Sequence, residues 1–124
     1  METLLALLMF WAPQPVIQFS HADARTLVRN APQVNELAES CIVINENHLP
    51  NDEGVVLFMV YSKCGKPAVS SLVGGYYVDL RTGDVRLGAP ENEPEQSERL
   101  KRVRESLLQK KAKAKTPNNK AKKN

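Results

Sequence analysis

The chain has 124 residues, of which 42% are hydrophobic and 25% are charged, so it has room for a single domain. It contains two cysteines, Cys41 and Cys64, placed 23 positions apart, and two histidines, His21 and His48. This spacing offers no cluster of metal ligands, so we expect neither a metal site nor a cofactor.

The charge is divided unevenly along the chain. Residues 1–98 contain 6 basic and 13 acidic side chains, a net charge of −7, whereas residues 99–124 contain 11 basic side chains and one acidic side chain, a net charge of +10. The overall charge of +3 therefore hides an acidic body joined to a basic tail. A block of like charge is typical of a solvated extension or of an arm for an anionic partner.

The N-terminal segment resembles a targeting signal. Residues 4–12 form an unbroken apolar run, which is shorter than the roughly 20 residues that cross a bilayer but suits the central part of a signal peptide. Small residues at 20–22 and again at 22–24 offer cleavage sites. Because Glu2 stands where a positive charge is expected, a buried N-terminal helix or a wrongly chosen start codon stays open. We predict a signal peptide over residues 1–22 and a periplasmic or secreted protein, with a cytoplasmic one as the alternative.

The cysteine pair has two interpretations. An even number of cysteines in an exported chain favours a Cys41–Cys64 disulfide, which would stabilise a small domain by roughly 3 kcal/mol. Two free thiols in a cytosolic protein are the alternative.

Two short helical segments are expected at residues 23–30 and 32–40. Their apolar residues recur at spacings of three and four, which indicates one buried stripe. Pro32 interrupts that stripe, so we predict an N-terminal helix that is kinked or split there. The carboxylate of Asp23 suits the start of a helix, where it faces the positive end of the helix dipole.

Four strands are predicted at residues 41–44, 55–62, 70–80 and 84–87. The loop at 45–54 and the turn at 63–67 connect the first three. Gly74 and Gly75 suggest a bulge or a close approach by the helix, and Gly83 supplies the positive φ of a tight turn. The order predicts an α+β fold over residues 23–88, in which a helix packs on a four-stranded antiparallel meander.

Four segments resemble small exported PepSY-like domains: residues 24–28, 32–34, 58–61 and 77–85, the last reading YVDLRTGDV. In that family a helix packs on an antiparallel sheet that ends in such a hairpin. The hairpin is also similar to immunity proteins of the nuclear-transport-factor-like class. The resemblance covers residues 23–87 and brings no catalytic residue, and neither family has this cysteine pair or the basic tail. It implies an envelope protein that binds another protein, such as a peptidase, and inhibits or modulates it.

The C-terminal part, residues 89–124, is predicted to be a basic helix that starts near residues 93–95, followed by disorder from Lys110 onward. Its cations are candidates for binding an anionic polymer, a lipid surface or a nucleic acid, although no aromatic residue is present to stack on bases. A tail without a fixed partner and a tail docked on the acidic body are the alternatives. The candidate cations are Arg99, Lys101, Arg102, Arg104, Lys110, Lys111, Lys113 and Lys115.

No catalytic site is evident. Oxidation of Cys64 would prevent a nucleophilic pair with His48, and Asp79 and Asp84 flank a turn, where carboxylates commonly bind backbone N–H groups. Glu46, Asp52 and Glu53 fall in a loop without the spacing of a calcium site.

Tyr76 and Tyr77 should point to opposite faces of the sheet, one buried and one exposed, and the exposed ring is a candidate protein contact. The sequence therefore predicts a binding or inhibitory module of the cell envelope and not an enzyme. The alternatives are a toxin-neutralising immunity protein and a cytosolic nucleic-acid accessory protein.

Overall fold

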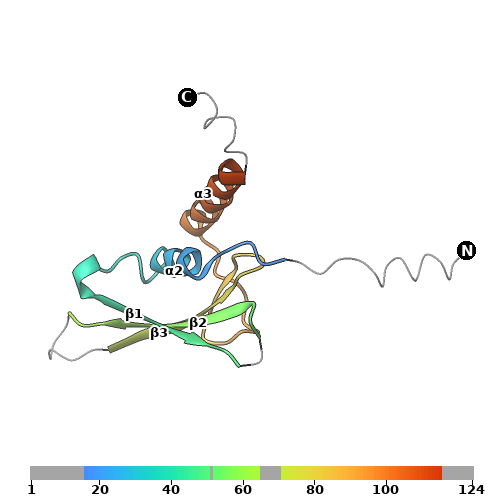
Figure 1. Cartoon of the computed structure of the whole chain (residues 1–124). Coiled ribbons are helices and arrows are strands. Elements are labelled where there is room, and N and C mark those ends of the chain that lie inside the picture. Colours follow the sequence, from blue (N-terminus) through green and yellow to red (C-terminus); the bar gives the residue numbers. More distant parts are fainter. Residues whose placement is uncertain (1–15, 51, 65–70, 116–124) are drawn as a thin grey trace, which may run out of the picture.

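The structure is a computed structural model that describes residues 16–50, 52–64 and 71–115 (Figure 1). Four antiparallel strands form one sheet in the order β1-β2-β3-β4, and α2 and α3 both lie on the same side of it. This arrangement confirms the predicted α+β fold. In chain order the elements are α2 (His21–Arg29), a 3₁₀ turn (Glu39–Cys41), β1 (Ile42–His48), β2 (Val55–Ser62), β3 (Ser71–Asp79), β4 (Val85–Leu87) and α3 (Glu98–Lys115).

Helix α2 begins two residues before its predicted start, because Ser20 caps it. The Ser20 hydroxyl accepts a hydrogen bond from the Asp23 N–H at 3.0 Å, and the Asp23 carboxylate accepts one from the Ser20 N–H at 3.0 Å. This reciprocal pair satisfies two of the donors that a helix start leaves free. The predicted signal peptide boundary after residue 22 therefore falls inside α2.

The predicted second helical segment at residues 32–40 is not an α-helix. It consists of turns followed by the 3₁₀ turn. The Arg29 guanidinium donates to the carbonyl oxygens of Val34 at 2.9 Å and Leu37 at 3.0 Å, so a side chain satisfies acceptors that helical N–H groups would otherwise take. The prediction of a break at Pro32 is correct, but the apolar residues after Pro32 belong to a series of turns and not to a second helix.

Strand β1 is longer than predicted and continues to His48. Residues 45–48, expected in a loop, pair with β2 up to the partners His48 and Val56. Their polar side chains suggested a loop, but β1 is an edge strand, and polar residues are common there. His48 is consequently a strand residue.

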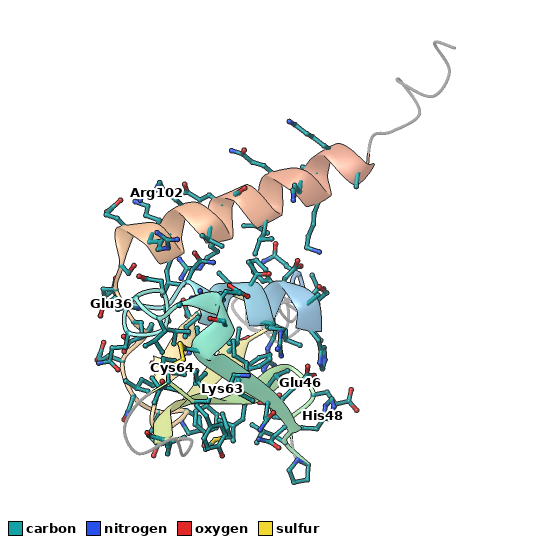
Figure 2. All side chains as sticks on the ribbon, turned by 90° about the vertical axis from the view of Figure 1, so that its left-hand side faces the viewer. Glu36, Glu46, His48, Lys63, Cys64 and Arg102 are labelled. Carbon is teal, nitrogen blue, oxygen red and sulfur yellow. A yellow bond between two sulfur atoms is a disulfide. The ribbon has the colours of Figure 1, made fainter. Side chains whose placement is uncertain are left out.

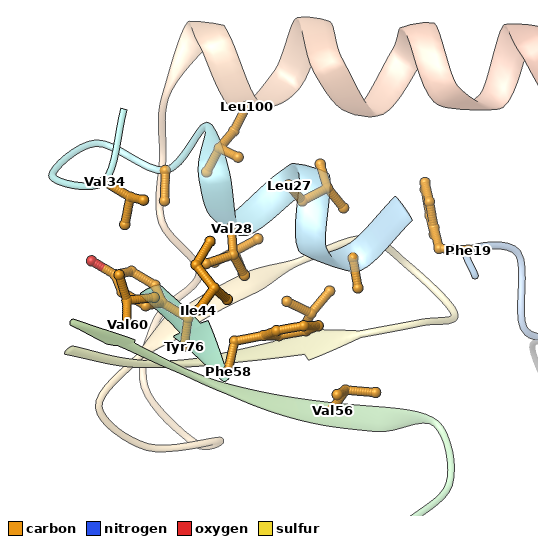
Figure 3. Close-up of a cluster of buried hydrophobic side chains, with 14 of the residues drawn as sticks. Phe19, Leu27, Val28, Val34, Ile44, Val56, Phe58, Val60, Tyr76 and Leu100 are labelled. Atoms are coloured by element: carbon orange, nitrogen blue, oxygen red, sulfur yellow. The ribbon is translucent and has the colours of Figure 1, made fainter. Parts of the chain in front are cut away.

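The core fills the space between the sheet and the two helices (Figure 3). The inward side chains of β2 and β3 meet the apolar face of α2, and α3 packs against α2 on the side away from the sheet (Figure 3). Phe19 is 1% exposed, and the N–H groups of Gln18 and Phe19 both donate to the Leu80 carbonyl, so the chain preceding α2 belongs to the folded body. The largest core side chains are Phe19, Leu27, Val28, Val34, Val56, Phe58, Val60, Tyr76, Val78, Leu80, Val85 and Leu100.

The turns of the sheet follow the sequence signals. Gly83 has a φ of +81° between β3 and β4, as predicted. The strand pairing of β2 with β3 shifts beside Val60, and Val73 is the extra residue of a bulge next to Gly74. Asp79 accepts a hydrogen bond from the Arg81 N–H at 2.8 Å, which confirms its role in the turn.

Helix α3 starts at Glu98, capped by the Ser97 hydroxyl, which accepts from the Leu100 N–H at 3.2 Å. Pro94, expected near the helix start, instead pairs with Arg86 at the edge of β4. The helix extends to Lys115 where disorder was predicted from Lys110, and residues 116–124 lie outside the described residues. Within the described ranges, no helix is both long and apolar enough to cross a membrane.

Candidate functional site

The Cys41–Cys64 disulfide is formed, as predicted, with the two Cα atoms 5.1 Å apart. It links the residue before β1 to a residue just after β2, at the end of the strand pair where the Lys63 N–H also donates to the Cys41 carbonyl at 2.9 Å. The edge strand β1 and its neighbour β2 are therefore fixed to each other at one end.

Within the described residues, both α-helices lie on one side of the sheet, and no helix lies over its other face (Figure 1). Along β2, Val56, Phe58 and Val60 point into the core, so the alternate residues Leu57, Met59 and Tyr61 point to the other face, where they are half-buried. The strand pairing puts Tyr77 of β3 opposite Leu57, and Val43 of β1 opposite Tyr61. We call this surface the open face, defined by Val43, Leu57, Met59, Tyr61 and Tyr77.

The two tyrosines lie on opposite faces, as predicted, but only one is accessible. Tyr76 is in the core and Tyr77 is on the open face, so Tyr76 is removed from the predicted contacts. Leu72, which pairs with Tyr61 at the end of β3, is 56% exposed. Arg86 pairs with Tyr77 at the opposite side of the sheet. Asn45 and Asn47 of β1, which pair with Met59 and Leu57, and Arg86 of β4 give the open face polar margins along both sides, whereas Leu72 extends its apolar part at the end of β3.

Three of the candidate cations of α3 hold the helix on the body. Lys111 forms an ion pair with Asp23 at 2.9 Å, Arg99 donates to the Asn30 side chain at 2.8 Å, and Arg104 donates to the Gly83 carbonyl at 3.2 Å. Of the alternatives for the basic tail, docking on the body therefore holds for its helical part.

Four other candidate cations of α3 are exposed: Lys101, Arg102, Lys110 and Lys113. Among the described residues none of these four has an ion-pair partner, and the side chain of Lys115 lies outside the description. Arg102 projects from the surface of α3 away from the sheet (Figure 2).

The Asp23 carboxyl has a pKa below its ordinary value of 3.8. Partial burial raises this pKa, but the hydrogen bond and positive charge of Lys111 and the hydrogen bonds from Ser20 outweigh the burial. The charged form of Asp23 is consequently part of the contact between α2 and α3.

A group of three polar side chains was missed by the sequence reasoning. His21 at the first position of α2, and Glu46 and His48 on β1, bring one ligand atom each to within 4.8 Å of one another. The His21 Nδ1 and the Glu46 carboxylate are hydrogen-bonded, and the His48 Nε2 lies 3.8 Å from the same carboxylate oxygen. Figure 2 shows Glu46 and His48 projecting from the same end of β1.

This group was missed because His21 was assigned to the leader and His48 to a loop. A glutamate and a histidine two positions apart share one face of a strand, which is the signal that the sequence contained. Asp52 does not join them, because it forms an ion pair with Arg81 at 3.1 Å and accepts a hydrogen bond from the Gly54 N–H at 2.9 Å. His48 and the disulfide lie at opposite ends of the β1–β2 pair, so Cys64 and His48 do not form a nucleophilic pair.

Comparison of the chain with protein families, curated proteins and solved structures found no significant match. The resemblance to PepSY-like domains consequently stays a prediction.

Proposed function

We propose that the protein is an exported binding module that holds a protein partner on the open face and inhibits or modulates it, without catalysing a reaction. The observation that carries this proposal is the open face itself, where Leu57, Met59 and Tyr77 lie side by side and no helix of the described part of the chain covers them. Apolar and aromatic side chains at the centre of a surface, with polar groups around them, are typical of protein contacts.

The rigidity of the sheet favours binding. The open face is carried by paired strands that a disulfide joins at one end, so its side chains lose little backbone freedom when a partner docks. Residues 1–98 contain 13 acidic against 6 basic side chains, which favours attraction of a basic protein, and the apolar open face favours a partner whose contact is apolar at its centre. An envelope peptidase, as the PepSY-like resemblance implies, and a basic toxin, as expected for an immunity protein, both fit this description.

We propose that the protein is exported to the periplasm or out of the cell. Disulfides persist in the periplasm and outside the cell, and the apolar run at residues 4–12, which lies outside the described residues, is the expected leader. The disulfide weighs against the cytosolic nucleic-acid accessory alternative. Because Phe19 is in the core and Ser20 caps α2, we expect processing to leave residues 16–22 on the mature protein.

A second binding surface is proposed on α3. Lys101, Arg102, Lys110 and Lys113 are exposed without acidic partners in the described part of the chain, so they are free to attract an anionic polymer or lipid head groups. Truncation of the chain after Gly88 is unsuitable for testing this, because it would also remove Leu100 from the core.

The open face is tested by site-specific photo-crosslinking in the native host. A photoreactive phenylalanine analogue at Tyr77 should give one discrete adduct in the envelope fraction, and the same analogue at Arg102, on the outer surface of α3, should not give that adduct. The adduct partner is then purified and titrated against the full chain. Leu57→Glu, which places a charge at the centre of the open face, should weaken its binding by roughly 30-fold or more.

Arg102→Glu is the matched control, since it also introduces a glutamate but lies away from the open face. Equal weakening by both substitutions, or an adduct that is only a second copy of this chain, would contradict the proposal. Thermal unfolding of both variants establishes that any loss of binding is not a loss of folding.

A further inference from the structure

We propose that His21, Glu46 and His48 bind one divalent transition-metal ion of the zinc class at the junction of α2 and β1. This proposal is independent of the partner on the open face, since these side chains belong to the end of the sheet that faces the start of α2.

The donor set of two imidazoles and one carboxylate suits a zinc-class ion. Two imidazole nitrogens and one carboxylate oxygen are a common three-residue ligand set for zinc, and imidazole also suits copper and nickel, whereas calcium and magnesium prefer oxygen ligands alone. Three protein ligands leave a further position for water or for a group supplied by another molecule.

The separations of the three ligand atoms are close to those of a zinc site. Zinc lies about 2.0–2.1 Å from its nitrogen and oxygen ligands, which puts the ligand atoms of a tetrahedral site about 3.4 Å apart. The His48 Nε2 is 3.8 Å from the Glu46 oxygen, and all three ligand atoms lie within 4.8 Å of one another. The imidazole rings have their centroids 5.5 Å apart and are tilted by 40°. Small rotations of the side chains are therefore enough to complete the site.

These rotations are available because the side chains are accessible. The side chains of His21, Glu46 and His48 are 45%, 30% and 76% exposed, and none of them takes part in the hydrophobic core. The Glu46 carboxylate already lies beside the imidazoles of His21 and His48. An ion that enters from solvent therefore finds its three ligands close together.

The surroundings add negative charge. His21 and His48 line a surface hollow of about 420 Å³ together with Leu49, Asp52 and Glu53. Asp52 is paired with Arg81, but the Glu53 carboxylate has no partner among the described residues and favours a cation nearby. The positive end of the α2 dipole opposes a cation at His21, and the Asp23 carboxylate in the first turn of α2 offsets this effect only in part, because it is paired with Lys111.

A bound ion would add a link between two parts of the fold that already meet at this end through the hydrogen bond of His21 with Glu46. It would tie the first residue of α2 to the last residues of β1, and hence hold the capped start of the helix over the edge of the sheet. Because the unfolded chain does not keep these three ligands together, the ion should stabilise the folded protein and raise its melting temperature.

The test is a calorimetric titration of the full chain with zinc chloride, with any polyhistidine tag removed. One ion should bind per chain, and the melting temperature should rise with zinc concentration. His48→Asn and Glu46→Gln should each weaken zinc binding by at least about 10-fold, since even partners outside the ligand set change metal affinity by that factor. Glu36→Gln is the matched control, because Glu36 is an exposed carboxylate on the opposite side of the molecule in Figure 2.

Binding of zinc that His48→Asn leaves unchanged would overturn the proposal, as would the absence of one-to-one binding to the wild-type chain. His48 is the most exposed of the three ligands, so His48→Asn should unfold at the wild-type temperature when a chelator is present. This comparison separates loss of the ligand from loss of the fold.

Discussion

The hydroxyl of Tyr76 is the least favourable polar group in the described core. It is buried and has no hydrogen-bond partner among the described residues. Burial raises the pKa of Tyr76, and the negative charge of Glu95 raises it further. The ring packs in the hydrophobic core beside Gly74, whereas its oxygen loses its hydration without a replacement among the described residues.

Tyr76→Phe should therefore leave the free energy of unfolding unchanged or raise it by up to about 1 kcal/mol. The sign of the pH effect follows from the raised pKa. The unfolded chain loses the Tyr76 proton near pH 10.0 while the folded chain keeps it, so this group lowers stability above that pH, and the substitution should remove that part of the alkaline loss. Urea unfolding at neutral and alkaline pH measures both effects. A clear loss of stability at neutral pH would show that the hydroxyl has a partner after all.

Residues with locally determined roles were predicted well from the sequence. Gly83 was assigned a positive φ because a turn between two strands requires it, and Asp79 was assigned to the same turn. The cluster of His21, Glu46 and His48 was not predictable in the same way, because it forms only when the start of α2 comes over the end of β1. The residues adjacent to His21 in the sequence do not indicate that contact.

At the scale of elements, α3 joins the body by a combination of apolar and charged contacts. Leu100 is completely buried, and the Lys111–Asp23 ion pair connects the far part of α3 to the first turn of α2. The sequence suggested a separate basic tail because cations outnumber the apolar residues there. The few leucines at helical spacing were the signal for docking, and a short stripe of this kind is easily outweighed by charge in a sequence argument.

Lys111→Gln should lower the free energy of unfolding by about 0.5–1 kcal/mol at neutral pH, as expected for a partly exposed ion pair. The depressed pKa of Asp23 means that its contribution is complete above the ordinary value of 3.8 and is lost as the pH falls through the lower folded value. The difference between wild type and variant should accordingly shrink below pH 3.8. Lys110→Gln, at an exposed neighbour without a partner among the described residues, should have no such effect; a similar effect there would point to net charge alone.

The elements differ in how far the sequence determined them. Strand β2 was predicted with its observed bounds, because it is apolar on both faces and ends at clear turn signals. Strand β1 was predicted too short, because its second half is polar. Residues 32–40 were wrongly predicted as a helix, because their apolar residues have helical spacing, which turns can bury as well. Edges and loops depend on tertiary contacts more than the centre of a sheet does.

For the molecule as a whole, the disulfide is the main constraint on the unfolded chain. The covalent link between Cys41 and Cys64 closes a loop with a sequence separation of 23 around the β1–β2 pair. In a domain with so small a core, this constraint is a large part of the total stability.

Replacing both cysteines by alanine should lower the free energy of unfolding by roughly 3 kcal/mol. Adding a reductant to the wild-type protein should give a similar loss, while the double variant should not respond to the reductant. Urea unfolding with and without reductant measures these differences. Equal stability of the oxidised and reduced wild-type protein would show that the bond is not a source of stability.

The hydrogen bond from Arg25 to the Ile44 carbonyl, at 3.0 Å, has a consequence for self-assembly. In an antiparallel pair, the backbone N–H and C=O groups of successive residues point alternately toward and away from the neighbouring strand. The Cys41 carbonyl accepts from the Lys63 N–H and so points toward β2. The backbone groups of Ile44, three residues further along, therefore point away from β2 toward the free edge of the sheet. The guanidinium therefore occupies an acceptor that an incoming strand from another chain would need. Together with the polar second half of β1, this contact disfavours the pairing of a second chain along β1, so the apolar open face should bind a partner without also promoting edge-to-edge polymerisation.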